Sequence, residues 1–162
     1  MATFEFLGLD EYLGQLNELK EHATGLIKRA VYDGAAQVAN AVAAEIQNLP
    51  EVDGYQYPWN VPISGVTREQ KAGLLEGLGL AKMEDSSGFI NTHVGFDGYN
   101  SVKSKKYPGG QPNAMLARSI NSGSSTRRKI PFMSRALKNA KDKAQSAMAA
   151  RLDADIETII NN

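Results

Sequence analysis

Residues 24–49, TGLIKRAVYDGAAQVANAVAAEIQNL, carry the most regular apolar pattern of the sequence. Apolar residues recur there every three to four positions, which is the spacing of one helix face. They are Ile27, Val31, Ala35, Val38, Val42, Ile46 and Leu49. The segment therefore predicts a long amphipathic helix that ends at Pro50, because proline lacks the N–H needed to continue it. Gly34 weakens this helix by roughly 1 kcal/mol relative to alanine. Because alanines surround it, Gly34 also allows a second backbone to approach closely.

A second helix is predicted just before this one. Residues 9–22, LDEYLGQLNELKEH, place leucines at helical spacing, and Asp10 can cap the helix start. Residues 3–6, TFEF, alternate instead, with Phe4 and Phe6 on one face and Thr3 and Glu5 on the other. This alternation predicts a short half-buried strand.

The last segment, from about 131 to 160, predicts another long helix. Its apolar positions are Phe132, Met133, Leu137, Ala140, Ala144, Met148, Leu152, Ile156, Ile159 and Ile160. Pro131 suits the first helical position, since its missing N–H would be unpaired there anyway. We expect Phe132 to pack back onto the domain and anchor the helix start.

The length of this helix has a consequence for its far end. About 30 residues span ~45 Å at 1.5 Å per residue, whereas a compact chain of this size is only ~40 Å across. The end of the helix should therefore reach or pass the edge of the domain. Ile156, Ile159 and Ile160 lie there, and they either cover the protein's own first helix or meet a neighbouring subunit.

The middle of the chain predicts shorter elements. Thr67 and Gln70 form a capping box for a short helix. Residues 80–96 alternate on both sides of DSSG, which predicts a hairpin with Ile90, Val94 and Phe96 on one face. A short helix follows at 112–123. Together these elements predict one α+β domain over residues 1–162. A small, mostly antiparallel sheet packs against two long helices, and 97–111 and 122–130 form extended loops.

Composition narrows the functional classes. Eighteen Lys and Arg balance eighteen Asp and Glu, so no overall field attracts nucleic acid or an anionic membrane. The sequence has no cysteine, which excludes disulfides and cysteine nucleophiles. It shows neither a basic, apolar leader nor an apolar run of ~18 residues, so we expect a soluble product made in the cytoplasm.

No residue pattern predicts catalysis. The two histidines, His22 and His93, lie in polar surroundings without a second ligand at metal-binding spacing. The serines at 122–125 lack a nucleophile elbow. Residues 107–113, YPGGQPN, lack the Gly-Lys-Ser/Thr ending of a phosphate loop. We therefore expect no enzyme, no metal and no cofactor.

Two basic clusters are the remaining candidates for contacts. Lys103, Lys105 and Lys106 lie in the first loop, and Arg127, Arg128 and Lys129 precede the last helix. Exposed cations near a helix start suit phosphates or a protein partner, although charged runs are commonly just solvated. We expect both loops to be mobile in a free subunit and ordered by neighbours, because they have little apolar surface to bury.

In combination these segments resemble the minor tail or neck proteins of long-tailed bacteriophages, in the form found in phages and prophages of Gram-positive bacteria. The likeness rests on Ser-Gly-Ser-Ser at 122–125 followed by Pro131, Phe132, Met133, Ala136 and Leu137. It extends to FLGLDEYLGQLNEL at 6–19 and to the stretch 81–123. Two departures concern the loop before the last helix. Asn121 stands where many members carry an acidic residue, and a second proline near Ser134 is missing.

The resemblance implies a structural virion protein at the head–tail junction, made in the host cytoplasm and located in the tail or neck. It implies a homo-oligomeric ring, six- or twelve-fold, that contacts neighbouring neck and tail proteins. DNA would pass through the channel without sequence-specific binding, and no membrane would be involved. No catalytic or cofactor residue is carried over. The alternative is a small nucleic-acid-binding or regulatory module that uses its basic loops.

Overall fold

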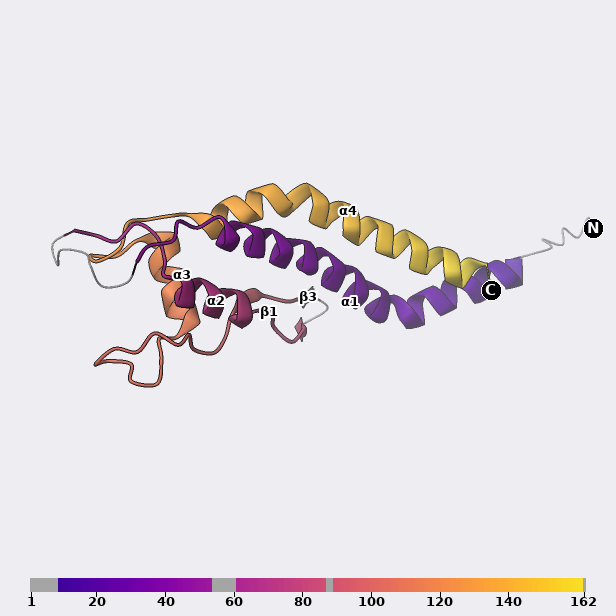
Figure 1. Ribbon diagram of the computed structural model, residues 1–162. Coiled ribbons are helices and arrows are strands. Elements are labelled where there is room, and N and C mark those ends of the chain that lie inside the picture. The colour runs from indigo at the N-terminus through magenta and orange to yellow at the C-terminus, as the bar shows by residue number, and fades with distance from the viewer. Residues whose placement is uncertain (1–8, 54–60, 87–88, 162) are drawn as a thin grey trace, which may run out of the picture.

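The computed structural model describes residues 9–53, 61–86 and 89–161. Over these residues the chain is an α+β fold, in which two long helices pack against short antiparallel strands (Figure 1). The elements in chain order are α1 (Leu9–Gln47), α2 (Arg68–Gly77), β1 (Leu78–Leu80), β2 (Glu84–Ser86), β3 (Phe89–Asn91), β4 (Val94–Phe96), α3 (Asn113–Ser122) and α4 (Phe132–Ile160). The strand predicted at 3–6 lies outside the described residues.

The first helix is longer than predicted. Residues 9–22 and 24–49 form one helix, α1, of 39 residues, so two separate helices were the wrong prediction. No proline interrupts the join. Gly25 costs about 1 kcal/mol, which packing along the helix can offset because helical stability in proteins comes mainly from tertiary packing.

α1 and α4 run antiparallel as the main pair of the fold (Figure 1). Their charges match along the pair: Arg135 donates to Glu45 at 2.9 Å, and Arg29 donates to Asp155 at 2.7 Å. The close approach predicted at Gly34 is confirmed. A Cβ at Gly34 would lie 2.5 Å from Cγ of Met148.

The hairpin prediction is confirmed as two antiparallel ladders. β1 pairs with β4, with Leu78 opposite Phe96, and β2 pairs with β3, with Glu84 opposite Asn91. The predicted capping box also forms, since Thr67 accepts from the Gln70 N–H and the Gln70 side chain accepts from the Thr67 N–H. These local features position α2 and the hairpin along α1.

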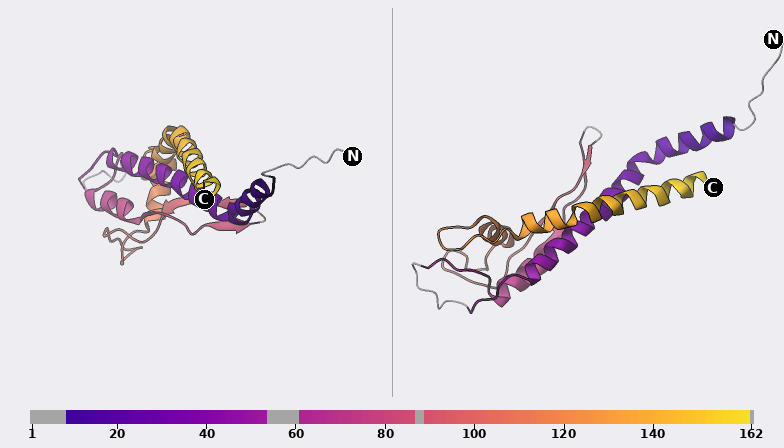
Figure 2. Two further views of the ribbon diagram at one scale, coloured as in Figure 1. Left: turned by 90° about the vertical axis from the view of Figure 1, so that its right-hand side faces the viewer. Right: turned by 90° about the horizontal axis from the view of Figure 1, so that it is seen from above.

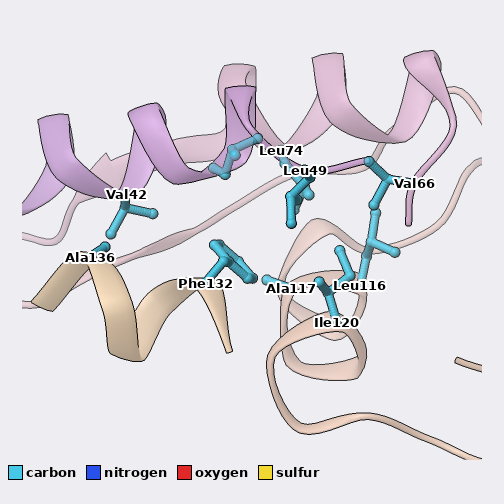
Figure 3. Close-up of a cluster of buried hydrophobic side chains, with 10 residues drawn as sticks. Val42, Leu49, Val66, Leu74, Leu116, Ala117, Ile120, Phe132 and Ala136 are labelled. Carbon is cyan, nitrogen blue, oxygen red and sulfur yellow. The ribbon is translucent and has the colours of Figure 1, made fainter. Parts of the chain in front are cut away.

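The apolar core lies at one end of the helix pair, where α2 and α3 join it (Figure 3). Its buried residues are Val42, Ile46, Leu49, Val66, Leu74, Leu116, Ala117, Ile120, Phe132 and Ala136. Phe132 is fully buried, and its ring centroid lies 6.2 Å from that of Phe96. The prediction that Phe132 anchors the start of α4 is confirmed.

Beyond this core the two long helices continue as a pair, and the far end of the pair extends past the hairpin (Figures 1 and 2). We call this pair the arm: residues 13–33 of α1 with residues 148–160 of α4. Of the arm residues, Leu26 and Ala30 alone are buried. The observed helix has 29 residues and is ~44 Å long, which agrees with the prediction that the last helix reaches the edge of the domain or passes it.

Candidate subunit interface

The arm leaves several large apolar side chains uncovered. Leu13, Leu16 and Ile27 of α1 are 47%, 43% and 43% exposed, and Ile160 of α4 is 44% exposed. Ile27 was predicted to lie on the buried stripe, but Leu26 and Ala30 occupy the buried positions beside α4. Two paired helices can cover one face of each other and no more, so the flanking apolar side chains remain in contact with water.

The end of α4 lies against α1 of the same chain. The Gln15 side chain donates to the carbonyl of Ile160 at 3.0 Å, and Asp155 pairs with Arg29. Ile156 and Ile159 are half-buried. Of the two alternatives for these isoleucines, the protein's own first helix therefore covers a part of Ile156 and Ile159. Ile160 remains exposed.

The first basic loop is closed at its base. The Asn100 N–H donates to the Gln111 carbonyl at 2.9 Å, and Tyr99 bridges to Pro112 just before α3. Lys103, Lys105 and Lys106 are exposed, and Nζ of Lys106 lies 5.5 Å from the Tyr107 ring centroid. These lysines therefore remain candidate contacts.

Arg127 does not behave as the sequence predicted. Its guanidinium is buried, with the residue 8% exposed, and donates to the carbonyl of Gly65 and to Oε1 of Gln70. Burial lowers its pKa from the usual value for arginine. The prediction that Arg127 contacts a partner was wrong. Its guanidinium instead attaches this loop to Gly65, before α2, and to Gln70, within α2. Arg128 and Lys129 are exposed, as predicted.

The rest of the second loop is also attached to the domain. The Ile63 N–H donates to Thr126 at 2.9 Å, and the Arg128 N–H donates back to Ile63 at 2.8 Å. The Ile130 N–H donates to Ile120 at 2.8 Å. These hydrogen bonds attach residues 126–130 to the domain, and the mobility of residues 122–130 in a free subunit stays a prediction.

The start of α4 is built from the residues that carry the phage-protein resemblance. Gly123 ends α3 with φ of 80°, a backbone conformation that favours glycine. Asn121 accepts from the Met133 N–H at 3.1 Å, which caps the first turn of α4. Pro131 precedes the first helical residue rather than occupying that position.

A groove that the sequence did not predict lies between α1, α4 and the hairpin. Its volume is about 630 Å³, and most of the side chains that line it are apolar. Leu137, predicted to be on the buried stripe of α4, is instead 59% exposed at this groove, because the neighbouring Ala136 is buried in its place. Two sequence features pointed toward this region: the close pairing at Gly34 and the shared face of Ile90, Val94 and Phe96.

The described residues hold no group of three or more His, Asp or Glu side chains that could bind a metal ion. His22 and His93 are both exposed. Among the described helices, none combines the length and apolar character needed to cross a membrane.

Comparisons with protein families, characterised proteins and solved structures find no match to this chain. The geometry defines an α+β protein with exposed apolar side chains on a two-helix arm and an apolar groove beside it.

Proposed function

We infer that this protein is a structural subunit of the head–tail junction of a long-tailed bacteriophage. Identical copies would assemble into a ring around the DNA channel and join or complete the tail. The observation that carries this proposal is the arm. Its exposed side chains, Leu13, Leu16, Ile27 and Ile160, offer an apolar surface that a second copy can bury.

The start of α4 supports the same proposal. Two residues of the signature have structural contacts there: Gly123 ends α3, and Phe132 is fully buried in the core at the start of α4. A signature with an architectural role suits a structural protein better than an enzyme.

Charge favours the ring over the nucleic-acid-binding alternative. The net charge is zero, and burial of Arg127 removes one of the six clustered cations from solvent contact. The cations that stay exposed lie on loops, where they suit neighbours in a ring or the backbone of passing DNA without reading its sequence.

The test measures the mass of the assembly by light scattering after size exclusion, together with negative-stain images. The wild-type protein should form closed rings, and Leu13→Glu with Leu16→Glu should abolish them. The matched control is Asn17→Glu with His22→Glu, at exposed polar positions of the same helix.

Two outcomes would overturn the proposal. One is a protein that stays monomeric at every concentration reached. The other is salt-sensitive retention of DNA that Lys105→Ala and Arg128→Ala weaken, which would favour the nucleic-acid-binding module.

A further inference from the structure

The groove beside the arm has the composition of a binding surface for an apolar segment. Val31 and Val38 of α1 form one wall, Leu137 and Met148 of α4 another, and Ile90, Val94 and Phe96 of the hairpin the third. Leu137 is the most exposed leucine among those whose exposure is described. An open apolar groove of about 630 Å³ leaves these side chains in contact with water, so an apolar occupant would be stabilised there.

The rim of the groove is positively charged. A shallower hollow of about 530 Å³ continues it along α4 and shares Val38, Leu137 and Met148 with it. Lys138 and Lys141 line this extension and are exposed. Neither lysine takes part in an ion pair among the described residues.

Polar groups in the groove suit an extended backbone. Oδ1 of Asn91 is buried there without a hydrogen-bond partner among the described residues. In the described part of the chain β4 pairs with β1 alone, and β3 pairs with β2 alone. A peptide that enters as a strand could lie along these strands.

Residues 3–7, TFEFL, match this groove in pattern and charge. Phe4 and Phe6 fall on one face of an extended segment, while Glu5 falls on the other. Two aromatic side chains would thus meet the apolar walls. The carboxylate of Glu5 would lie outward, toward the rim that carries Lys138 and Lys141.

The segment cannot reach the groove of its own chain. Phe4 stands five residues before Leu9, so it lies within ~18 Å of it even when fully extended. Val31, the first α1 residue at the groove, stands 22 residues after Leu9 along the helix, a distance of ~33 Å. A second copy of the chain has no such restriction.

We propose that the groove between α1, α4 and the hairpin receives residues 3–7 of a second copy, with Phe4 and Phe6 against its apolar walls. This rests on the proposed function, since it makes the groove a contact between neighbouring subunits. The segment and the groove are different surfaces, so the contact is head-to-tail and repeats from copy to copy. Head-to-tail contacts form a closed ring when the rotation between copies closes, and an open filament when it does not.

The absence of cysteine in the chain allows a clean cross-linking test. Phe6→Cys protein is mixed with tagged Leu137→Cys protein under assembly conditions and oxidised. A disulfide-linked pair of one tagged and one untagged chain is expected. Lys105→Cys, at an exposed position of the first basic loop, replaces Leu137→Cys in the control and should give no such pair. The proposal is overturned if the mixed pair does not form. It is also overturned if a chain that carries both Phe6→Cys and Leu137→Cys forms the disulfide within itself.

A second measurement does not depend on a ring. A fluorescent peptide of residues 1–8 is titrated into full-length protein that carries Phe4→Ser and Phe6→Ser. The peptide should bind, and adding Leu137→Glu should weaken binding by about tenfold or more. Equal affinity for both proteins would overturn the contact. If the peptide binds while the wild-type protein stays monomeric, the proposed ring is contradicted, but binding of residues 3–7 in the groove is supported. If rings form without the Phe6–Leu137 cross-link, the ring is supported and binding in the groove is contradicted.

Discussion

Phe132 is the side chain on which the junction between the second basic loop and α4 depends. It is fully buried in the core. Phe132→Ala should therefore lower the free energy of unfolding by roughly 3–5 kcal/mol, through lost burial and the cavity left behind. Denaturant unfolding measures this. Leu137→Ala, on the same helix but 59% exposed, is the control and should cost much less. A change below about 1 kcal/mol at Phe132 would contradict its place in the core.

Arg127 and Arg128 are neighbours with opposite roles. Arg127→Ala removes two donors and leaves the Gly65 carbonyl without its partner, so we expect a loss of about 1.5–3 kcal/mol in unfolding free energy. Arg128→Ala removes an exposed side chain and should change stability by less than about 0.5 kcal/mol. Equal effects in thermal or denaturant unfolding would show that Arg127 does not fasten the loop.

The sequence predicted the role of Phe132 but not that of Arg127, for a physical reason. An aromatic residue after a proline at a helix start is a local signal, because it needs no distant partner to be recognised. Arg127 bonds to Gly65 and Gln70, which lie about 60 residues earlier in the chain. A run of three cations has the same pattern whether one of them turns inward or all three are solvated.

The pairing of α1 with α4 can be tested at Gly34. An added Cβ would lie 2.7 Å from the Met148 sulfur and 3.3 Å from the Ala144 carbonyl. Gly34→Val should therefore lower the unfolding free energy by roughly 1–3 kcal/mol, as overpacking does. At Gly14, also within α1, no atom lies within 4 Å of the added Cβ. Gly14→Ala should instead stabilise the protein by about 0.5–1 kcal/mol. Stabilisation by Gly34→Val in thermal unfolding would mean that the helices do not pack closely there.

Helix and hairpin positions followed from the sequence because their signals are periodic. The apolar spacing predicted the long helices, and Thr67 with Gln70 predicted the start of α2. The alternation on both sides of DSSG predicted the antiparallel pairing of the hairpin. Within the predicted stripe of α4, Leu137 was wrongly placed, since the neighbouring Ala136 is the buried residue. Where small apolar residues stand next to large ones, the sequence does not determine which of them faces the core. Close packing of α4 against α1 fixes the rotation of the helix about its axis.

The arrangement of these elements in space was less accessible. The groove is formed by three elements that are distant in the chain, so no single segment of the sequence predicts it. The extension of the last helix past the core was predictable, since it follows from helix length against domain size. Which side chains on that extension stay exposed depends on the angle at which α1 and α4 meet.

The separation of core and arm predicts a gradient of stability along both long helices. Val42, Ile46, Phe132 and Ala136 bury one end of the pair, whereas the arm buries Leu26 and Ala30 alone among its described residues. Local opening costs less where few apolar side chains are buried. Amides of residues 13–25 and 150–160 should therefore exchange with deuterium at least about tenfold faster than those of 38–47 and 132–140.

Assembly should reduce this difference in stability between the core and the arm. Hydrogen exchange measured by mass spectrometry below and above the assembly concentration should show slower exchange in the arm once its exposed apolar side chains are buried by a neighbour. The helices α2 and α3, away from the arm, serve as the internal reference and should change little. Uniform protection along α1 and α4 in the free subunit would contradict the division into core and arm. Rings that form without added protection of residues 13–25 would place the contact between subunits elsewhere.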